Sequence, residues 1–214
     1  MSTHPTKLKR VATGEPVEAE LHDELPLDAF FEAEELWAPE RVRILRECVK
    51  AKVSDADVPQ STHWNWSQKT LKLRSLLSGP LSPYRLFGMK AEGRWQGLMV
   101  CCCVGHHSKL HTEPRDVVYV DLVEAAPWNW EVKALGRSPQ LRGIGTQLIE
   151  LAVRWSDDLG FKGRVGLHSL RQSESFYSTR CGMTDLGPDN SYKPPMRYFE
   201  LSEKAARVFL ENQP

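Results

Sequence analysis

The chain of 214 residues has no apolar run close to the ~18 residues of a membrane-spanning helix. Its N-terminal residues lack the apolar stretch of a secretory signal peptide. Net charge is also absent, because 28 basic residues balance 28 acidic ones, so no global field attracts nucleic acid or an anionic membrane. The 5 cysteines are an odd number and a poor disulfide framework. We therefore expect a cytoplasmic protein that binds neither membrane nor nucleic acid and recognises its partner through a local site.

The composition is that of an ordinary globular protein. Hydrophobic residues make up 41% of the chain and charged residues 26%, which excludes wholesale disorder. The length predicts a single domain over residues 21–214, because domains commonly have roughly 100 to 200 residues. Residues 1–20 are polar and show no apolar period, so we expect a disordered arm without chemistry. Within the domain we expect a helical part over residues 21–80 and a core over residues 84–201.

Apolar spacing predicts three helices before the core. Between residues 25 and 52 we expect two helices, with Pro39 in the first turn of the second. The second helix is expected to bury a stripe made of Val42, Leu45, Val49 and Val53. A third short helix is expected from Gln68 to Leu77, ended by residues 78–80.

The pattern then changes to alternating strands and helices. Residues 84–90 and 95–104 predict a hairpin, and the β-branched residues 117–124 predict a further strand. A helical stripe follows, ended by Gly160, and is made of Ile144, Leu148, Leu151, Trp155 and Leu159. We expect a strand over residues 164–170, a helix over 173–180, a strand over 196–201 and a last helix from Ser202. The sequence therefore predicts a mixed α/β (α+β) domain.

One glycine-rich segment, residues 140–146 (Gln-Leu-Arg-Gly-Ile-Gly-Thr), carries the clearest chemical signal. We call it the glycine loop. Its two glycines allow a tight turn and leave amide N–H groups unpaired at a helix N-terminus, where the dipole favours an anion. Arg142 adds a cation that can bind an anion through two hydrogen bonds. A dinucleotide-binding turn would need a third small residue where Leu148 stands, and the G-x-x-x-x-G-K-[ST] phosphate-binding motif does not occur.

The glycine loop resembles the [QR]-x-x-G-x-G acetyl-CoA signature of the GNAT superfamily of N-acetyltransferases, in particular a bacterial subgroup with a long connection before the signature. As in that family, a strand and then a helix follow, with Phe176-Tyr177 before a Gly182-Met183 turn. The resemblance covers residues 84–201. It implies a mostly antiparallel central sheet flanked by helices, here with extra N-terminal helices, and acetyl-CoA as the co-substrate.

The same resemblance implies roles for individual residues. The CoA diphosphate would bind to Gln140, Leu141, Arg142, Gly143, Ile144, Gly145 and Thr146. Ala125 and Ala126 would position the thioester, and Ser169 would lie beside the pantetheine arm. Next to Ser169, Leu170 stands where many family members have an asparagine. Tyr177 occupies the position of the acid that protonates the leaving thiolate, with a packed core aromatic as the alternative.

Transfer to an amine also needs a base that removes the ammonium proton. Strand alternation places Glu124 at the end of an apolar face, where its pKa can be raised, and we take it as the first candidate. Asp121 is the second candidate and His168 the third. A solvent-exposed strand-end Glu124 and a structural His168 remain open as alternatives.

Residues 127–139 form a longer connection than is usual in the family. We assign Trp128 and Asn129 within it to the acceptor pocket, with core packing as the equal alternative. Residues 101–103 are three adjacent cysteines near several histidines, but they predict no metal site. Adjacent strand residues point to opposite faces, and the C-x₂-C spacing that converges two thiolates is missing.

The sequence thus predicts an acyltransferase. We expect an N-acetyltransferase that moves an acetyl group from acetyl-CoA to a primary amine of a small molecule or protein, by direct attack in a ternary complex. One alternative is a non-catalytic acyl-CoA-binding or protein-interaction module with the same fold. A weaker alternative is a toxin-like enzyme acting on aminoacyl-tRNA, against which the balanced charge argues. The oligomeric state is left open between a monomer and a homodimer.

Overall fold

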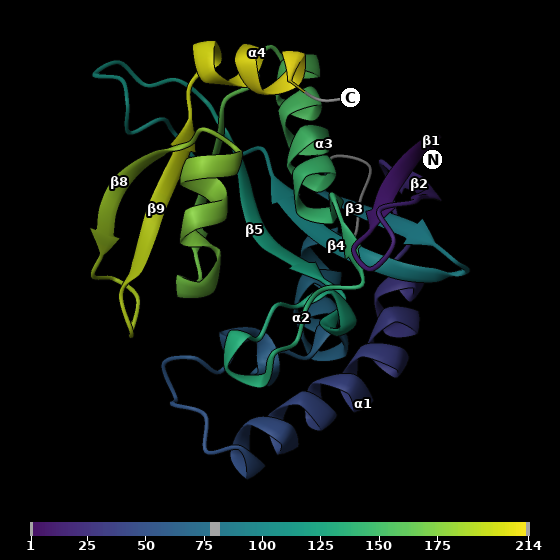
Figure 1. Ribbon diagram of the computed structural model, residues 1–214. Coiled ribbons are helices and arrows are strands. Elements are labelled where there is room, and N and C mark those ends of the chain that lie inside the picture. The colour runs from purple at the N-terminus through teal and green to yellow at the C-terminus, as the bar shows by residue number, and fades with distance from the viewer. Residues whose placement is uncertain (1, 78–81, 213–214) are drawn as a thin grey trace. The chain divides into compact units, whose positions relative to one another are not determined.

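The computed structural model describes residues 2–77 and 82–212 (Figure 1). Its strands are β1 (Thr3–Arg10), β2 (Pro16–His22), β3 (Tyr84–Ala91), β4 (Arg94–Cys102), β5 (Val118–Ala125), β6 (Leu141–Arg142), β7 (Val165–Ser169), β8 (Thr184–Asp189) and β9 (Met196–Leu201). Its α-helices are α1 (Asp28–Lys50), α2 (Trp66–Leu77), α3 (Ile144–Asp158) and α4 (Glu203–Glu211). Within the described residues, no helix is both long and apolar enough to cross a bilayer.

Among the described residues, the strands form one sheet in the order β6-β1-β2-β3-β4-β5-β7-β9-β8. The pairs β1–β2, β1–β6, β2–β3, β7–β9 and β8–β9 are antiparallel, whereas β5 and β7 run parallel. The predicted fold class, a mixed α/β fold with a mostly antiparallel sheet flanked by helices, is therefore confirmed. The predicted hairpin is β3–β4, and the β-branched strand is β5.

The backbone divides into two compact units, where the sequence predicts one domain over residues 21–214. The first unit consists of residues 1–98 and 123–145, and the second of residues 99–122 and 146–214. Strands β4 and β5 and helix α3 each have residues in both units. The two units interleave along the chain, and the single domain stays a prediction.

Residues 1–20 do not form the disordered arm that their polarity predicts. Strands β1 and β2 form an antiparallel hairpin, and Gly14 lies in its turn with φ of +77°. Leu8, Ala19 and Leu21 are buried, whereas most of the residues between them are exposed. Each strand carries only one or two inward apolar residues, which is too few to produce a visible sequence period. The prediction is wrong because the partners of this hairpin are distant in sequence.

Helix α1 is one continuous helix with Pro39 inside it, so the prediction of two helices is wrong. The predicted stripe is also wrong, since Val42 is 46% and Val49 71% exposed. The buried stripe is made of Trp37, Arg41, Ile44 and Cys48. An interior proline removes one helical hydrogen bond, and we infer that tertiary packing of this stripe offsets that cost.

The remaining expectations are mostly confirmed, with three exceptions. Helix α3 follows its predicted stripe from Ile144 to Trp155, whereas Leu159 lies beyond the helix end and is exposed. Gly160 follows with φ of +76°, and the Ser202 side chain accepts a hydrogen bond from the amide of Ala205 at the start of α4. In place of a helix over 173–180 there is a π-helical turn, Phe176–Arg180. Strand β8 is missed because its glycine, proline and aspartates disfavour strands except at a sheet edge. The predicted helix end at residues 78–80 lies outside the described residues.

Candidate active site

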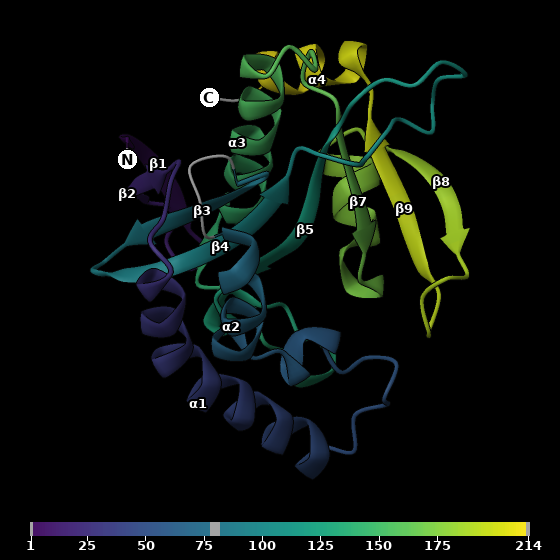
Figure 2. The same ribbon diagram turned by 180° about the vertical axis from the view of Figure 1, so that it is seen from behind.

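Strands β5 and β7 separate before either of them ends. Their parallel register stops at the pair Val120–Leu167, although β5 continues to Ala125 and β7 to Ser169. Figure 2 shows β7 between β5 and β9. We call the diverging stretch the strand opening; on the β5 side it begins with Asp121 and Leu122, and on the β7 side with His168 and Ser169. Backbone groups released from a ladder need other partners, so this opening suits a bound ligand.

Asp121 is the first residue of β5 beyond the register with β7. Its side chain is partly buried, and within residues 2–77 and 82–212 no hydrogen bond or ion pair joins it. Burial raises the pKa of Asp121 to about 6. An unpaired carboxylate whose pKa lies close to neutral pH has the property that a general base needs.

Tyr177 lies in the π-helical turn after β7 and points into the second unit. The residue is 6% exposed, and its ring lies 5.9 Å from that of Phe199 on β9. Burial raises the pKa of Tyr177, so its phenol stays protonated at neutral pH. Single π-helical turns occur frequently at functional sites. Of the pair Phe176 and Tyr177, the tyrosine is the more buried, and a neutral phenol can act as a proton donor.

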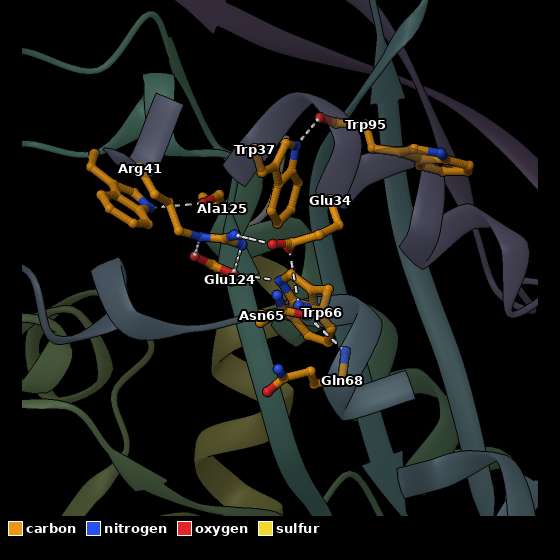
Figure 3. A network of polar contacts seen from close by, with 10 residues as sticks. Glu34, Trp37, Arg41, Asn65, Trp66, Gln68, Trp95, Glu124 and Ala125 are labelled. Atoms are coloured by element: carbon orange, nitrogen blue, oxygen red, sulfur yellow. Dashed lines mark hydrogen bonds and ion pairs between the residues drawn. The ribbon is translucent and has the colours of Figure 1, made fainter. Parts of the chain in front are cut away.

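Glu124 is buried in the first unit and fully engaged by neighbours (Figure 3). Arg41 donates from Nε to Oε1 at 3.3 Å and from a terminal nitrogen to Oε2 at 3.1 Å. The indole N–H of Trp66 also donates to Oε2. Arg41 bonds in addition to both carboxylate oxygens of Glu34 at 2.9 Å, and Glu34 accepts the backbone N–H of Trp66 at 2.9 Å. We call these four residues the buried network.

Charge within the buried network is unbalanced, because two carboxylates share one guanidinium. Burial raises the pKa of Glu124 to about 7, although Arg41 and Trp66 oppose the shift. A protonated Glu124 would leave Arg41 balanced by Glu34 alone. Lys69 on α2 is a further neighbouring cation; burial lowers its pKa, whereas attraction to Glu124 raises it. The arrangement suits a structural link between α1, α2 and β5 better than a base that must contact an acceptor.

The glycine loop is held on both sides by backbone contacts. Its first part is strand β6, which pairs with β1 of the N-terminal hairpin, and the amide of Val11 donates to the carbonyl of Gln140 at 3.0 Å. Within the loop, the amide of Gln140 donates to the carbonyl of Trp128 at 3.2 Å, and that of Leu141 to Oδ1 of Asn129 at 2.9 Å. These two amides therefore have protein partners, which contradicts the predicted anion-binding role of Gln140 and Leu141 through their N–H groups.

The later part of the loop keeps the predicted geometry. Gly143 has φ of +106°, a conformation that side chains other than glycine rarely adopt, and helix α3 starts at the next residue, Ile144. The first amides of a helix have no partner within it, so those of Ile144, Gly145 and Thr146 stay available to an anion. Arg142 is exposed beside them. These residues fit a CoA diphosphate.

Trp128 and Asn129 are buried and hydrogen-bonded within the first unit, which agrees with core packing, the alternative to an acceptor pocket. Trp128 is 6% and Asn129 9% exposed, and both donate to the side-chain oxygen of Gln96, at 2.8 and 3.0 Å. Gln96 is fully buried on β4 and also donates to the carbonyl of Ala91 at 3.0 Å. Asn129 thus links Gln96 to the amide of Leu141, so this hydrogen-bonded chain positions the glycine loop.

Ala125, Ala126 and Ser169 are likewise occupied by the protein itself. The amide of Ala126 donates to the carbonyl of Gln96 at 2.8 Å, and the carbonyl of Ala125 accepts the indole N–H of Trp130 at 2.8 Å. Ser169 is 2% exposed, and its hydroxyl donates to the carbonyl of Leu170 at 2.8 Å. These three groups therefore already have protein partners, and cofactor binding at Ala125, Ala126 and Ser169 stays a prediction.

His168, the third candidate base, belongs to a hydrogen-bonded chain in the second unit. Its Nδ1 lies 2.6 Å from the hydroxyl of Tyr119, and its Nε2 lies 3.0 Å from Oδ2 of Asp189. Burial lowers the pKa of His168 although Asp189 opposes the shift. The imidazole is therefore neutral at neutral pH.

Cysteine and histidine form no metal centre in the part of the chain that is described. Cys101 and Cys102 are buried in β4, as small apolar residues of a strand are.

Three important residues are not among the sequence candidates: Glu34, Arg41 and Gln96. Arg41 has a sequence signal, since it lies four residues after Trp37 and three before Ile44, on the buried face of α1. Gln96 has none, because its role depends on the fold of residues 127–141.

Neither a protein-family model nor a curated protein sequence matches the chain. Solved structures match over nearly the whole length. RimJ of Mycobacterium smegmatis in complex with CoA-disulfide is 12% identical with a TM-score of 0.52, covering 98% of this chain and 94% of that one. A putative arylalkylamine N-acetyltransferase 7 of the yellow fever mosquito is 12% identical with a TM-score of 0.52, covering 94% of each chain.

A third match is the microcin C7 self-immunity acetyltransferase MccE in complex with acetyl-CoA and AMP. It is 13% identical with a TM-score of 0.53, covering 85% of this chain and 91% of that one. At these identities the likeness establishes a common fold and no more.

Proposed function

We propose that this chain, which has the fold of the GNAT N-acetyltransferases, transfers an acetyl group from acetyl-CoA to a primary amine of a small molecule or protein. Two proteins with this fold form complexes with CoA-disulfide or with acetyl-CoA. The observation that carries the proposal lies in this chain itself. Asp121 is an unpaired, partly buried carboxylate with a pKa of about 6 at the strand opening.

The proposed reaction is a direct attack in a ternary complex. Acetyl-CoA supplies the thioester. Asp121 accepts a proton from the ammonium group of the acceptor, and the neutral amine attacks the thioester carbonyl carbon to form the new C–N bond. The C–S bond then breaks, and Tyr177 donates its phenolic proton to the leaving thiolate. The second proton, which the attacking nitrogen loses as the amide forms, returns Tyr177 from phenolate to phenol. We prefer Asp121 to Glu124 as the base because Arg41 and Trp66 already bond to the oxygens of Glu124.

Binding of the co-substrate is assigned to the later part of the glycine loop. The amides from Ile144 to Thr146 and the guanidinium of Arg142 bind the diphosphate. Gly143 allows the backbone to approach the ligand closely, and Asn129 holds the preceding residue Leu141 in place. These assignments differ from the sequence-based ones in excluding the amides of Gln140 and Leu141.

Calorimetric titration with acetyl-CoA and CoA tests the binding site. Saturable binding is expected for the wild type and a loss of about 100-fold or more for Arg142→Glu, which places a carboxylate beside the diphosphate. Gly143→Asp is expected to abolish binding. The matched control is Arg154→Glu, a charge reversal at a 59% exposed arginine of helix α3, which follows the loop, and this variant should bind like the wild type. Equal affinity in Arg142→Glu and Arg154→Glu would contradict the proposed site.

Tyr177→Phe is expected to lower kcat by about 100-fold, because proton transfer by a positioned side chain contributes roughly 10²- to 10⁴-fold. The ring contact with Phe199 is kept, so the folded state and the affinity for acetyl-CoA should stay near wild type. Thiol release over a panel of amines measures kcat, and thermal unfolding measures the fold. Unchanged kcat would show that Tyr177 is a packing residue. Tight acetyl-CoA binding without thiol release for any amine would favour the non-catalytic module.

A further inference from the structure

Aromatic rings surround His168 on one face of the second unit. His168 on β7 and Tyr198 on β9 are directly opposite each other, with ring centroids 4.9 Å apart. The ring centroid of Tyr192, which follows β8, lies 4.6 Å from that of His168. Tyr198 is 4% exposed and Tyr192 37%. Rings so arranged present electron-rich faces to a cation.

A permanent negative charge lies beside these rings. Asp189, at the end of β8, accepts the amide N–H of Ser191 at 3.0 Å and bonds to His168 at 3.0 Å. These hydrogen bonds, that to Ser191 first, lower the pKa of Asp189 to about 2, so it is a carboxylate at any physiological pH. We call Asp189, His168, Tyr192 and Tyr198 the aromatic–carboxylate subsite. Because His168 is neutral, the aromatic–carboxylate subsite carries a net negative charge from Asp189.

An ammonium group already occupies this subsite. The Nζ of Lys109 lies 4.2 Å from the ring centroid of Tyr198 and 3.7 Å from Oδ2 of Asp189. The backbone of Lys109 is fixed to β9, because its N–H donates to Glu200 at 2.7 Å and the hydroxyl of Ser108 donates to the same buried carboxylate. The side chain of Lys109 is 53% exposed. An exposed ion pair and cation–π contact hold it weakly, so it can leave while its loop stays in place.

We propose that the aromatic–carboxylate subsite binds a second ammonium group of the acceptor in place of Lys109, so that the acceptor is a diamine. This inference rests on the proposed function. Asp189 is too weak a base to deprotonate an amine, so the cation that it holds stays charged and cannot be the attacking nitrogen. One ammonium is therefore recognised at Asp189, and the other loses its proton and is acetylated. Lys109 competes with the acceptor for the subsite.

The probes are 1,5-diaminopentane, 1,4-diaminobutane and the matched monoamine 1-aminopentane. For the wild type, the kcat/KM of thiol release is expected to be about tenfold higher for a diamine than for the monoamine. Asp189→Asn should remove this preference, so that the kcat/KM values for the diamines fall to that for the monoamine. Lys109→Met should lower KM for the diamine by about threefold to tenfold, because it removes the competing ammonium. The control Lys162→Met removes a lysine that is also 3.7 Å from a carboxylate, that of Glu203, and should behave as wild type.

Calorimetry with 1,5-diaminopentane in the absence of acetyl-CoA separates the two proposals. Binding that weakens in Asp189→Asn and strengthens in Lys109→Met supports the subsite even if no thiol is released, in which case only the proposed function fails. Thiol release with equal kcat/KM for diamine and monoamine, unaffected by either substitution, keeps the function and overturns the subsite. Equal effects of Lys109→Met and Lys162→Met would also overturn it, because they would reflect surface charge alone.

Discussion

Arg41→Ala is expected to lower the free energy of unfolding by about 3–5 kcal/mol, the usual cost of leaving buried charges without their partner. The substitution leaves the carboxylates of Glu34 and Glu124 in the first unit without the guanidinium that both accept bonds from. Arg41 itself is 2% exposed, so water cannot replace it. Urea unfolding at neutral pH measures the loss. A small loss would mean that one carboxyl is already protonated.

The matched control is Arg43→Ala, two residues along the same helix. Arg43 also donates two hydrogen bonds to a carboxylate, that of Glu40, at 2.8 and 2.7 Å, but its side chain is 57% exposed. Exposed pairs contribute roughly 0–1 kcal/mol, so this variant should remain within about 1 kcal/mol of wild type. Equal losses in the two variants would contradict a special role for the buried network.

Stability should also depend on pH through Glu124. Its pKa is about 7 in the folded state and near 4.5, the ordinary value of a glutamate, when unfolded, so the folded state holds an extra proton between these values. This carboxyl thus contributes stability that is present below pH 4.5 and is lost as the pH rises through 7. The Asp121 carboxyl, with a pKa of about 6, acts in the same direction. Glu124→Gln should reduce the fall in unfolding free energy between pH 5 and pH 8.

Asp121→Asn is expected to lower kcat/KM by about 100-fold or more, within the roughly 10²- to 10⁴-fold range of general base catalysis. An amide cannot accept the ammonium proton, yet it fills the same space at the strand opening. In the wild type, kcat/KM should fall as the pH drops through about 6, where the Asp121 carboxylate becomes protonated. In Asp121→Asn, kcat/KM should not show this fall at low pH. Thiol release with the best amine of a panel, between pH 5 and pH 8, measures both effects.

Glu124→Gln distinguishes the two candidate bases. If Asp121 is the base, kcat/KM of Glu124→Gln still falls as the pH drops through about 6, and the substitution mainly lowers the free energy of unfolding. If Glu124 is the base, the wild-type fall lies near pH 7 and disappears in Glu124→Gln, while Asp121→Asn keeps it. That second result would restore the order of candidates that the sequence suggests.

Strand alternation and the glycine loop make part of this site predictable. Glu124 falls at the end of the apolar face of β5 and is buried there, as the alternation of the sequence indicates. The start of α3 at Ile144 and the left-handed Gly143 agree with the glycine spacing. Of Phe176 and Tyr177, which lie about 100° apart on an ideal helix, the structure buries the tyrosine more deeply.

Partners distant in sequence could not be predicted in this way. The sequence offers a raised pKa for Glu124 as a reason for catalysis, whereas the fold brings Arg41 and Trp66 to its oxygens from residues 83 and 58 positions away. Trp128 and Asn129 have the character of pocket residues, but Gln96 bonds to both of them from β4. In each case the local residue type is compatible with two roles, and only the identity of the neighbour decides between them.

Local periodicity and the glycine loop thus predict the order of most strands and helices, and the helix start suited to an anion. These depend on residues close together in the chain, where backbone geometry fixes which side chains share a face. The tertiary structure alone decided which carboxylate lies unpaired at the strand opening and which is bound by arginine. It also decided that Lys109 lies against Asp189 and Tyr198, from residues about 80 and 90 positions further along. Burial and charge pairing depend on the whole fold, and they set the chemistry of a carboxylate.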